Sequence, residues 1–146
     1  MTQLSPHFTL EELTFSQTAA RKGIDNDPPP NVEAILRMTA ARMEAVRTVL
    51  GGKGISVSSG YRSPELNVAV GGSRTSAHTT GWAVDFTCPA FGSPLAVCKA
   101  IAASDLEFDQ LIHEYGRWVH VGFGPRLRRQ LLTIGPKGTT NGLYAL

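Results

Sequence analysis

The segment SAHTTGWAVDF, residues 76–86, places a carboxylate, Asp85, in an apolar run and a histidine, His78, seven residues before it. An ionised carboxylate among apolar side chains is costly unless a cation or a set of hydrogen-bond donors receives it. A metal ion is one such cation, and the segment RWVHVGF, residues 117–123, supplies a second histidine, His120. Two histidines, one carboxylate and an open fourth position describe a catalytic zinc site, where the metal activates water.

Two predicted strands present these side chains. Alternate side chains of a strand point to opposite faces, so His120 shares a face with Gly122, and Asp85 shares a face with Ala83. His78 lies on the loop that enters the Asp85 strand and is the third candidate ligand. The plainer interpretation of the same residues is two ordinary hydrogen-bonded histidines and an aspartate that caps a turn.

Hydrolysis by an activated water also needs a base, and two residues are candidates. A three-residue turn within EYGRW would pair Glu114 with Trp118 and place Glu114 on the face of His120. A two-residue turn would change the parity and place His113 opposite His120 instead. We favour Glu114 as the base, with His113 as the alternative.

The first third of the chain predicts helices. HFTLEELTFS contains a capping box, Thr9 with Glu12, and predicts a helix that ends near Gly23. After the rigid connector DNDPPP, Asn31 is the predicted cap of a long helix that Gly51 ends. The apolar face of that helix is predicted to belong to the core: Val32, Ile35, Leu36, Met43, Val46, Val49 and Leu50.

The remainder predicts mostly strands. The strand segments are ISVSS, GWAVDF, FDQLIHE and RWVHVGF, and one further helix, SPLAVCKAIAAS, has Ser93 as its predicted cap. The segment GYRSPELN is read as a turn, and the tail after Pro125 is ambiguous. This order predicts an α+β fold, in which a small antiparallel sheet carries the site and packs against N-terminal helices.

Length and cysteine content suggest one ordinary globular domain. The chain of 146 residues is 42% hydrophobic and 18% charged, which predicts a single domain over residues 1–146. The catalytic motifs would occupy residues 58–123, and residues 124–146 would form a tail of uncertain structure. Two cysteines, Cys88 and Cys98, are too few for a disulfide framework and are predicted to be buried free thiols.

The charge pattern limits the partners. A net charge of +2 argues against nucleic-acid binding. The basic segment PRLRRQLL is read as a solvated face or as a surface attracted to a polyanion such as a bacterial cell wall. We find no signal-peptide pattern and no apolar run long enough to insert into a membrane, and a monomer is expected.

Several segments together resemble one known family. SAHTTGWAVD resembles the S-x-H-x-x-G-x-A-x-D motif of the zinc D-alanyl-D-alanine carboxypeptidases and L-alanyl-D-glutamate peptidases. FDQLIHEYGRWVHVGF resembles the second motif of that family, with a tryptophan two residues before the last zinc histidine, and VSSGYRSPELN resembles its S-G-Y-R-S segment. HFTLEELTFS and GIDNDPPP resemble the start of short phage-type members, so the resemblance runs from about residue 6 to residue 128.

This resemblance implies roles for individual residues. It implies zinc on His78, Asp85 and His120, and a cell-wall peptide as the substrate. It also implies that Arg62, whose guanidinium can make paired hydrogen bonds, holds a substrate carboxylate or carbonyl. Two further candidates follow from position: Ser76 would bind substrate or fix the loop of His78, and Gln110 would either line the cleft or make hydrogen bonds at the edge of the core. Some relatives carry an acidic residue three positions before the last zinc histidine, where this chain has Arg117.

The sequence therefore predicts a zinc-dependent peptidoglycan peptidase of the endolysin type. It would cut an L-Ala-D-Glu or a D-Ala-D-Ala bond of the stem peptide. We expect synthesis in a host cytoplasm without a signal peptide, and release to the wall by a holin. The alternatives are a catalytically idle zinc-bearing wall-binding or virion module, and a host-encoded carboxypeptidase of wall maturation, which should carry an export signal.

Overall fold

A six-stranded mixed sheet forms the centre of the computed structural model, which describes residues 2–146. Its strand order is β3-β4-β6-β5-β7-β8. All neighbours are antiparallel except β5 and β7, which are parallel. The strands are β3 (Ser56–Ser59), β4 (Ala83–Thr87), β5 (Gln110–Glu114), β6 (Trp118–Gly122), β7 (Gln130–Gly135) and β8 (Gly138–Asn141).

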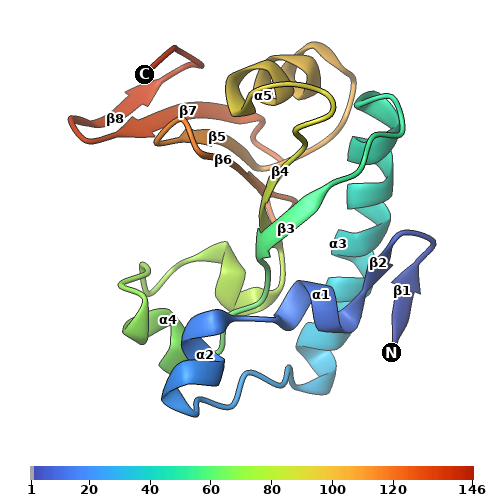
Figure 1. Ribbon diagram of the computed structural model, residues 1–146, viewed down its shortest axis with the longest axis vertical. Helices are drawn as coiled ribbons and strands as arrows, with labels where there is room; N and C mark the ends of the chain where they lie inside the picture. Colours follow the sequence, from blue (N-terminus) through green and yellow to red (C-terminus); the bar gives the residue numbers. More distant parts are fainter. Residues whose placement is uncertain (1) are drawn as a thin grey trace.

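In the view of Figure 1, the helix α5 lies above this sheet, the long helix α3 lies beside it, and the shorter helices lie below β3. The sheet of β1 (Gln3–Ser5) and β2 (Phe8–Thr9) contacts the long helix α3. The helices are α1 (Leu10–Thr14), α2 (Gln17–Lys22), α3 (Pro30–Val49), α4 (Pro64–Ala69) and α5 (Pro94–Ala103), with a 3₁₀ turn η1 (Ala77–Thr80). The predicted α+β fold is confirmed, and the ambiguous tail adds β7 and β8 to the sheet.

The N-terminal helix differs from the prediction in one respect. The capping box of Thr9 and Glu12 is present, but the expected single helix is two helices, broken at Phe15 and Ser16. Ser16 is extended, and its Oγ accepts a hydrogen bond from the amide of Ala19, so this serine begins a new helix instead of continuing the first.

Two other local predictions were wrong. Asn31 does not cap α3, because Pro29 is the N-cap and Pro30 the first helical residue. Proline suits that position, since it has no N–H to satisfy and its φ is already helical. The segment GYRSPELN is not only a turn: Ser63 caps the short helix α4. The predicted cap of α5, Ser93, is confirmed.

The two faces of the sheet have different surroundings. Residues on one face of β4 and β6, including Phe86 and Val121, join α3 and α5 in one buried apolar cluster. Of the predicted α3 core face, Ile35 and Val49 are only half-buried. Cys88 and Cys98 are buried free thiols, as predicted. The opposite face of β4 and β6 carries the polar residues of the site. Within residues 2–146, no helix combines the length and apolarity that a membrane span requires.

Candidate metal centre

The register of three adjacent strands brings the candidate residues together. In the β4–β6 ladder Asp85 lies directly opposite His120, and the ring Nδ1 of His120 is 2.9 Å from Asp85 Oδ1. His78 comes from outside the sheet, on η1, where Ser76 Oγ accepts a hydrogen bond from the His78 amide. The His78 Nε2 atom is 3.2 Å from the same carboxylate oxygen.

These three side chains meet the geometric condition for a metal site. One ligand atom from each of His78, Asp85 and His120 lies within 4.8 Å of the other two. The two imidazole rings meet edge to face, with centroids 5.1 Å apart. Two nitrogens and one carboxylate oxygen form a donor set that zinc accepts, and three protein ligands leave room for a fourth. The predicted ligands are therefore close enough to share one ion.

The proton positions also favour a cation at this point. The Nδ1 of His78 is 2.7 Å from the carbonyl oxygen of Gly60, and since a carbonyl only accepts, Nδ1 carries the hydrogen. In a neutral ring the lone pair is then on Nε2, which faces the Asp85 carboxylate. The lone pairs of His78 Nε2 and Asp85 Oδ1, whose atoms are 3.2 Å apart, require a shared proton or a cation between them. A metal ligated by Nε2, with Nδ1 held by a carbonyl, is a common arrangement in proteins.

The pKa directions agree with this arrangement. Burial lowers the pKa of His78, and the neighbouring Asp85 only partly opposes that effect. Burial alone would raise the pKa of Asp85, but the adjacent imidazoles of His120 and His78 outweigh that effect, so the net pKa is well below its usual range. A neutral imidazole beside an ionised carboxylate is the protonation state in which both groups bind a metal.

Gly60 is a functional residue that sequence reasoning missed. Its carbonyl orients His78, and its Cα packs against the backbone of α1, where an added Cβ would lie 2.2 Å from the Leu13 carbonyl oxygen. The next residue, Tyr61, donates its amide to that same oxygen at 2.7 Å. The S-G-Y-R-S resemblance includes this glycine, but only the contact between segments explains it.

Glu114 lies beside the three candidate ligands. The β5–β6 connection has three residues, and Glu114 pairs with Trp118 while Ile112 pairs with His120, as the prediction for a three-residue turn required. Glu114 Oε1 is 3.9 Å from His120 Nδ1. Burial and the charge of Asp85 raise the pKa of Glu114. The carboxylate is therefore positioned to exchange a proton within the site.

The alternative base, His113, lies on the other face of the strand. Its side chain is buried, and Nδ1 donates to the carbonyl of Tyr144 in the C-terminal segment at 2.9 Å. That contact holds the tail against the sheet. Because the turn has three residues, His113 and the candidate metal centre lie on opposite faces of the sheet. This arrangement favours Glu114 as the base.

Arg62 reaches the site from the loop between β3 and α4. Its Nη2 donates to Ser76 Oγ at 3.2 Å, and its backbone amide donates to the carbonyl of His78. Burial lowers the pKa of Arg62, while Asp85 and Glu114 oppose that effect. Within residues 2–146 its Nε is buried and has no hydrogen-bond partner. The guanidinium therefore retains donor capacity next to the candidate metal centre.

Asn26, from the connector DNDPPP, is a second residue that the sequence did not identify. Its Nδ2 donates to the carbonyls of Thr14 and Tyr61 at 2.7 and 3.0 Å, and its Oδ1 accepts the amide of Ser63 at 2.7 Å. These bonds tie the connector to the loop that carries Arg62. The segment GIDNDPPP resembles the family, but nothing in the sequence predicted which segments this side chain joins.

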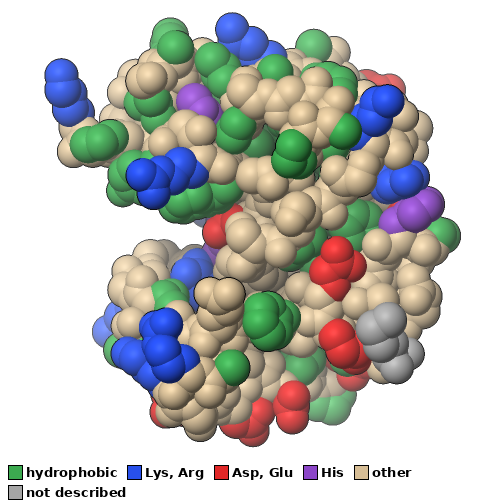
Figure 2. Space-filling view, viewed as in Figure 1, with side chains coloured by type: hydrophobic (Ala, Val, Ile, Leu, Met, Phe, Trp, Pro, Cys, Tyr) green, Lys and Arg blue, Asp and Glu red, His purple; other side chains and the backbone are tan. Residues whose placement is uncertain are grey.

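The site opens into a cavity of about 830 Å³. Figure 2 shows it as a deep notch, with acidic and histidine side chains at its inner end and basic side chains on both lips. Gln110 is among the residues that line the cavity, and its Nε2 donates to Gln130 Oε1 at 2.7 Å. On the rim, Arg128 makes a paired contact with Asp109, with atoms 2.7 and 3.0 Å apart. A cavity of this volume accommodates a peptide-sized ligand.

Comparison with known proteins agrees with the geometry. No curated protein matches the sequence. The family model described as Peptidase M15 matches residues 6–122, a span that includes α1, the S-G-Y-R-S loop and all three candidate ligands. Because this match covers most of the chain and ends within the strand that carries His120, the chain belongs to the peptidase M15 family.

Proposed function

We propose that this chain is a zinc-dependent peptidase that hydrolyses an amide bond in the stem peptide of peptidoglycan. Membership of the M15 family supports peptidase activity. The observation that carries the zinc proposal is the convergence of His78, Asp85 and His120 within 4.8 Å, with the Glu114 carboxylate next to them.

The proposed ligand atoms are His78 Nε2, Asp85 Oδ1 and His120 Nδ1. Zinc, when bound by them, supplies Lewis acidity that polarises the scissile carbonyl and makes water a stronger acid. Glu114 takes the proton of the attacking water and returns it to the leaving amine as the carbon–nitrogen bond breaks. Its raised pKa suits both steps, because it brings the carboxyl closer to neutral pH.

Arg62 has two proposed tasks in this scheme. Its guanidinium holds a carbonyl or carboxylate of the substrate, and its charge stabilises the oxyanion that forms during attack. Ser76 holds Arg62 through one hydrogen bond and the His78 loop through another, so we assign it a positioning role toward both. Gln110 contributes to the wall of the cleft.

The substrate and setting are proposals from the motif resemblance and from charge. Stem peptides carry carboxylates, which suit the basic side chains around the cleft (Figure 2). We propose that the chain acts as an endolysin on the cell wall, as a monomer, after synthesis in a host cytoplasm. Cleavage at L-Ala-D-Glu and at D-Ala-D-Ala both fit this function.

The test combines metal analysis with a lysis assay. The purified chain should bind about one zinc per chain and lower the turbidity of permeabilised Gram-negative cells. Both properties should disappear with a chelator and return with zinc. Asp85→Asn should lose zinc and lysis, whereas Asp105→Asn, a change at an exposed aspartate, should keep both. Wall binding without lysis would instead support an idle binding module, and a chain that never binds zinc would refute the proposal.

A further inference from the structure

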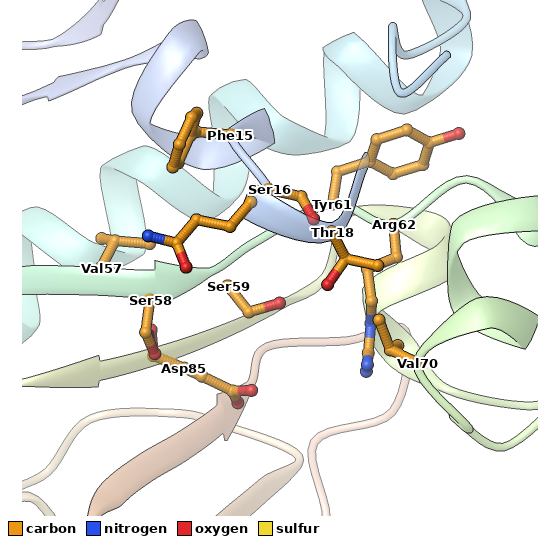
Figure 3. Close-up of a pocket in the computed structure, with 11 residues that line it drawn as sticks. Phe15, Ser16, Thr18, Val57, Ser58, Ser59, Tyr61, Arg62, Val70 and Asp85 are labelled. Atoms are coloured by element: carbon orange, nitrogen blue, oxygen red, sulfur yellow. Dashed lines mark hydrogen bonds between the residues drawn. The ribbon is translucent and has the colours of Figure 1, made fainter. Parts of the chain in front are cut away.

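A second cavity of about 510 Å³ adjoins the candidate metal centre on the side away from the strand β5. The two cavities share three lining residues, Arg62, Val70 and Asp85, so they meet at the site itself. Figure 3 shows Ser16, Thr18 and Ser59 arranged with Arg62 and Asp85 around the smaller space. A substrate bound across the centre therefore has room on both sides of the scissile bond.

The lining of the smaller cavity combines polar and apolar groups and is nearly uncharged. Its walls come from the Phe15–Thr18 junction of α1 with α2 and from the strand β3. They offer hydroxyl groups, the amide of Gln17 and the ring of Phe15, which is 63% exposed. Among the described lining residues, the charged ones are Arg62 and Asp85, which both belong to the candidate metal centre.

Local structure fixes this cavity in place. Ser16 Oγ accepts the amide of Ala19, which leaves the O–H of Ser16 available as a donor. On the other wall, β3 has an irregularity between Val57 and Ser59, and the displaced Ser58 donates its hydroxyl to the carbonyl of Asp85 at 3.2 Å. This hydrogen bond joins the irregular part of β3 to the backbone of Asp85.

The larger cavity has the opposite character. Asp85 and Glu114 lie at the metal-centre end of this cavity, Arg128 is paired with Asp109, and Arg74 and Arg126 are exposed cations on its outer walls. Anionic parts of a ligand are therefore stabilised on this side and gain little on the other. The two cavities together would orient a ligand that is uncharged at one end and acidic at the other.

We propose that the smaller cavity is a subsite for the uncharged N-acetylated sugar of a wall strand. The inference rests on the proposed function, because a wall strand provides neutral sugar on one side of the stem peptide and carboxylates along the other. Sugar hydroxyl and acetamido groups match the serine and threonine hydroxyls and the Gln17 amide, and a sugar face can pack on Phe15. The volume far exceeds what one terminal alanine would fill. The bond cut would then lie next to the sugar end of the stem.

Direct binding tests the subsite independently of cleavage. The probe is the neutral disaccharide N,N′-diacetylchitobiose, titrated into the full chain while amide NMR shifts are recorded. Shifts should concentrate at residues 15–18 and 58–59. Thr18→Trp should obstruct the cavity and weaken binding by about tenfold or more, and Phe15→Ala should weaken it without adding bulk. Thr48→Trp, the same substitution at an exposed position of α3, should have no effect on disaccharide binding.

Kinetics on two substrates separates the subsite from the proposed function. The wild type should cleave a sugar-linked stem peptide with a higher kcat/KM than the same peptide freed of sugar. Thr18→Trp should remove that preference, so that both substrates are cleaved with the same kcat/KM, whereas Thr48→Trp should keep it. Cleavage with no preference and no sugar-induced shifts would overturn the subsite but not the peptidase. Sugar binding without cleavage would overturn the peptidase but not the subsite. The absence of both sugar binding and cleavage would overturn both proposals.

Discussion

Replacing Gly60 by alanine tests the physical basis of the candidate site most directly. A Cβ at this position would lie 2.2 Å from the Leu13 carbonyl oxygen, whereas real Cβ contacts are essentially never below 3.0 Å. The two backbones must therefore separate by about 0.8 Å. Both partners are backbone, so no side chain can rotate to relieve the clash.

The expected loss of stability follows from the contacts that this movement disturbs. Overpacking typically costs ~1–3 kcal/mol, and loss of the Tyr61 N–H to Leu13 carbonyl bond adds roughly 1 kcal/mol. The Gly60 carbonyl also moves relative to His78 Nδ1, which it holds at 2.7 Å. Because a group that orients a metal-binding histidine is displaced, zinc affinity should fall by about 10–100-fold.

Two measurements on Gly60→Ala and on a control variant test this prediction. Urea unfolding of the metal-free chain gives the stability change, and competition with a chromogenic chelator gives the zinc affinity. Gly54→Ala is the matched control, because its Cβ would meet nothing within 4 Å and its φ is not positive. Wild-type zinc affinity in Gly60→Ala, or an equal loss of zinc affinity in Gly54→Ala, would contradict this prediction.

Three further predictions concern the base, the connector and the cleft rim. Glu114→Gln should lower kcat by about 10²–10⁴-fold while zinc stays bound, whereas His113→Gln should leave peptide cleavage little changed; equal losses in a muropeptide assay would contradict the assignment. Asn26→Ala removes three hydrogen bonds and should lower the free energy of unfolding by about 2–3 kcal/mol in urea; an unchanged midpoint would mean that water replaces them. Hydrogen bonds from Arg128 lower the pKa of Asp109, so the ionised pair stabilises the fold above the unfolded pKa of ~4 and loses that effect on acidification. Asp109→Asn should therefore destabilise the chain at neutral pH and converge with the wild type in acid, and a pH-independent difference in thermal unfolding would refute this.

Several features of the fold could be predicted because they depend on neighbours in the sequence. The capping box of Thr9 and Glu12 and the Ser93 cap of α5 are hydrogen bonds across three residues. The alternation of side chains along β6 placed His120 on the polar face before any strand pairing was known. The start of α2 after Ser16 and the start of α3 at Pro30 were harder to predict, because a serine or a proline at these positions fits several local structures.

The candidate base shows where sequence reasoning stops. The turn length decides whether Glu114 or His113 faces His120, and both turns were compatible with EYGRW. The structure has the three-residue turn, with Tyr115 and Gly116 both at positive φ. The Tyr115 amide also donates to the carbonyl of Ile134 in β7 at 2.7 Å, a contact between distant segments that the local sequence does not reveal.

By itself, then, the sequence determined which residue types were available and on which strand faces they would lie, because helix caps and strand alternation are local. Only the tertiary structure decided that Asp85 lies opposite His120, that the Gly60 carbonyl holds His78 against α1, and that Asn26 joins the connector to the Arg62 loop. Such contacts join segments far apart in the chain. Their geometry depends on how the sheet and helices pack, and hydrophobic burial drives that packing without specifying any single polar contact.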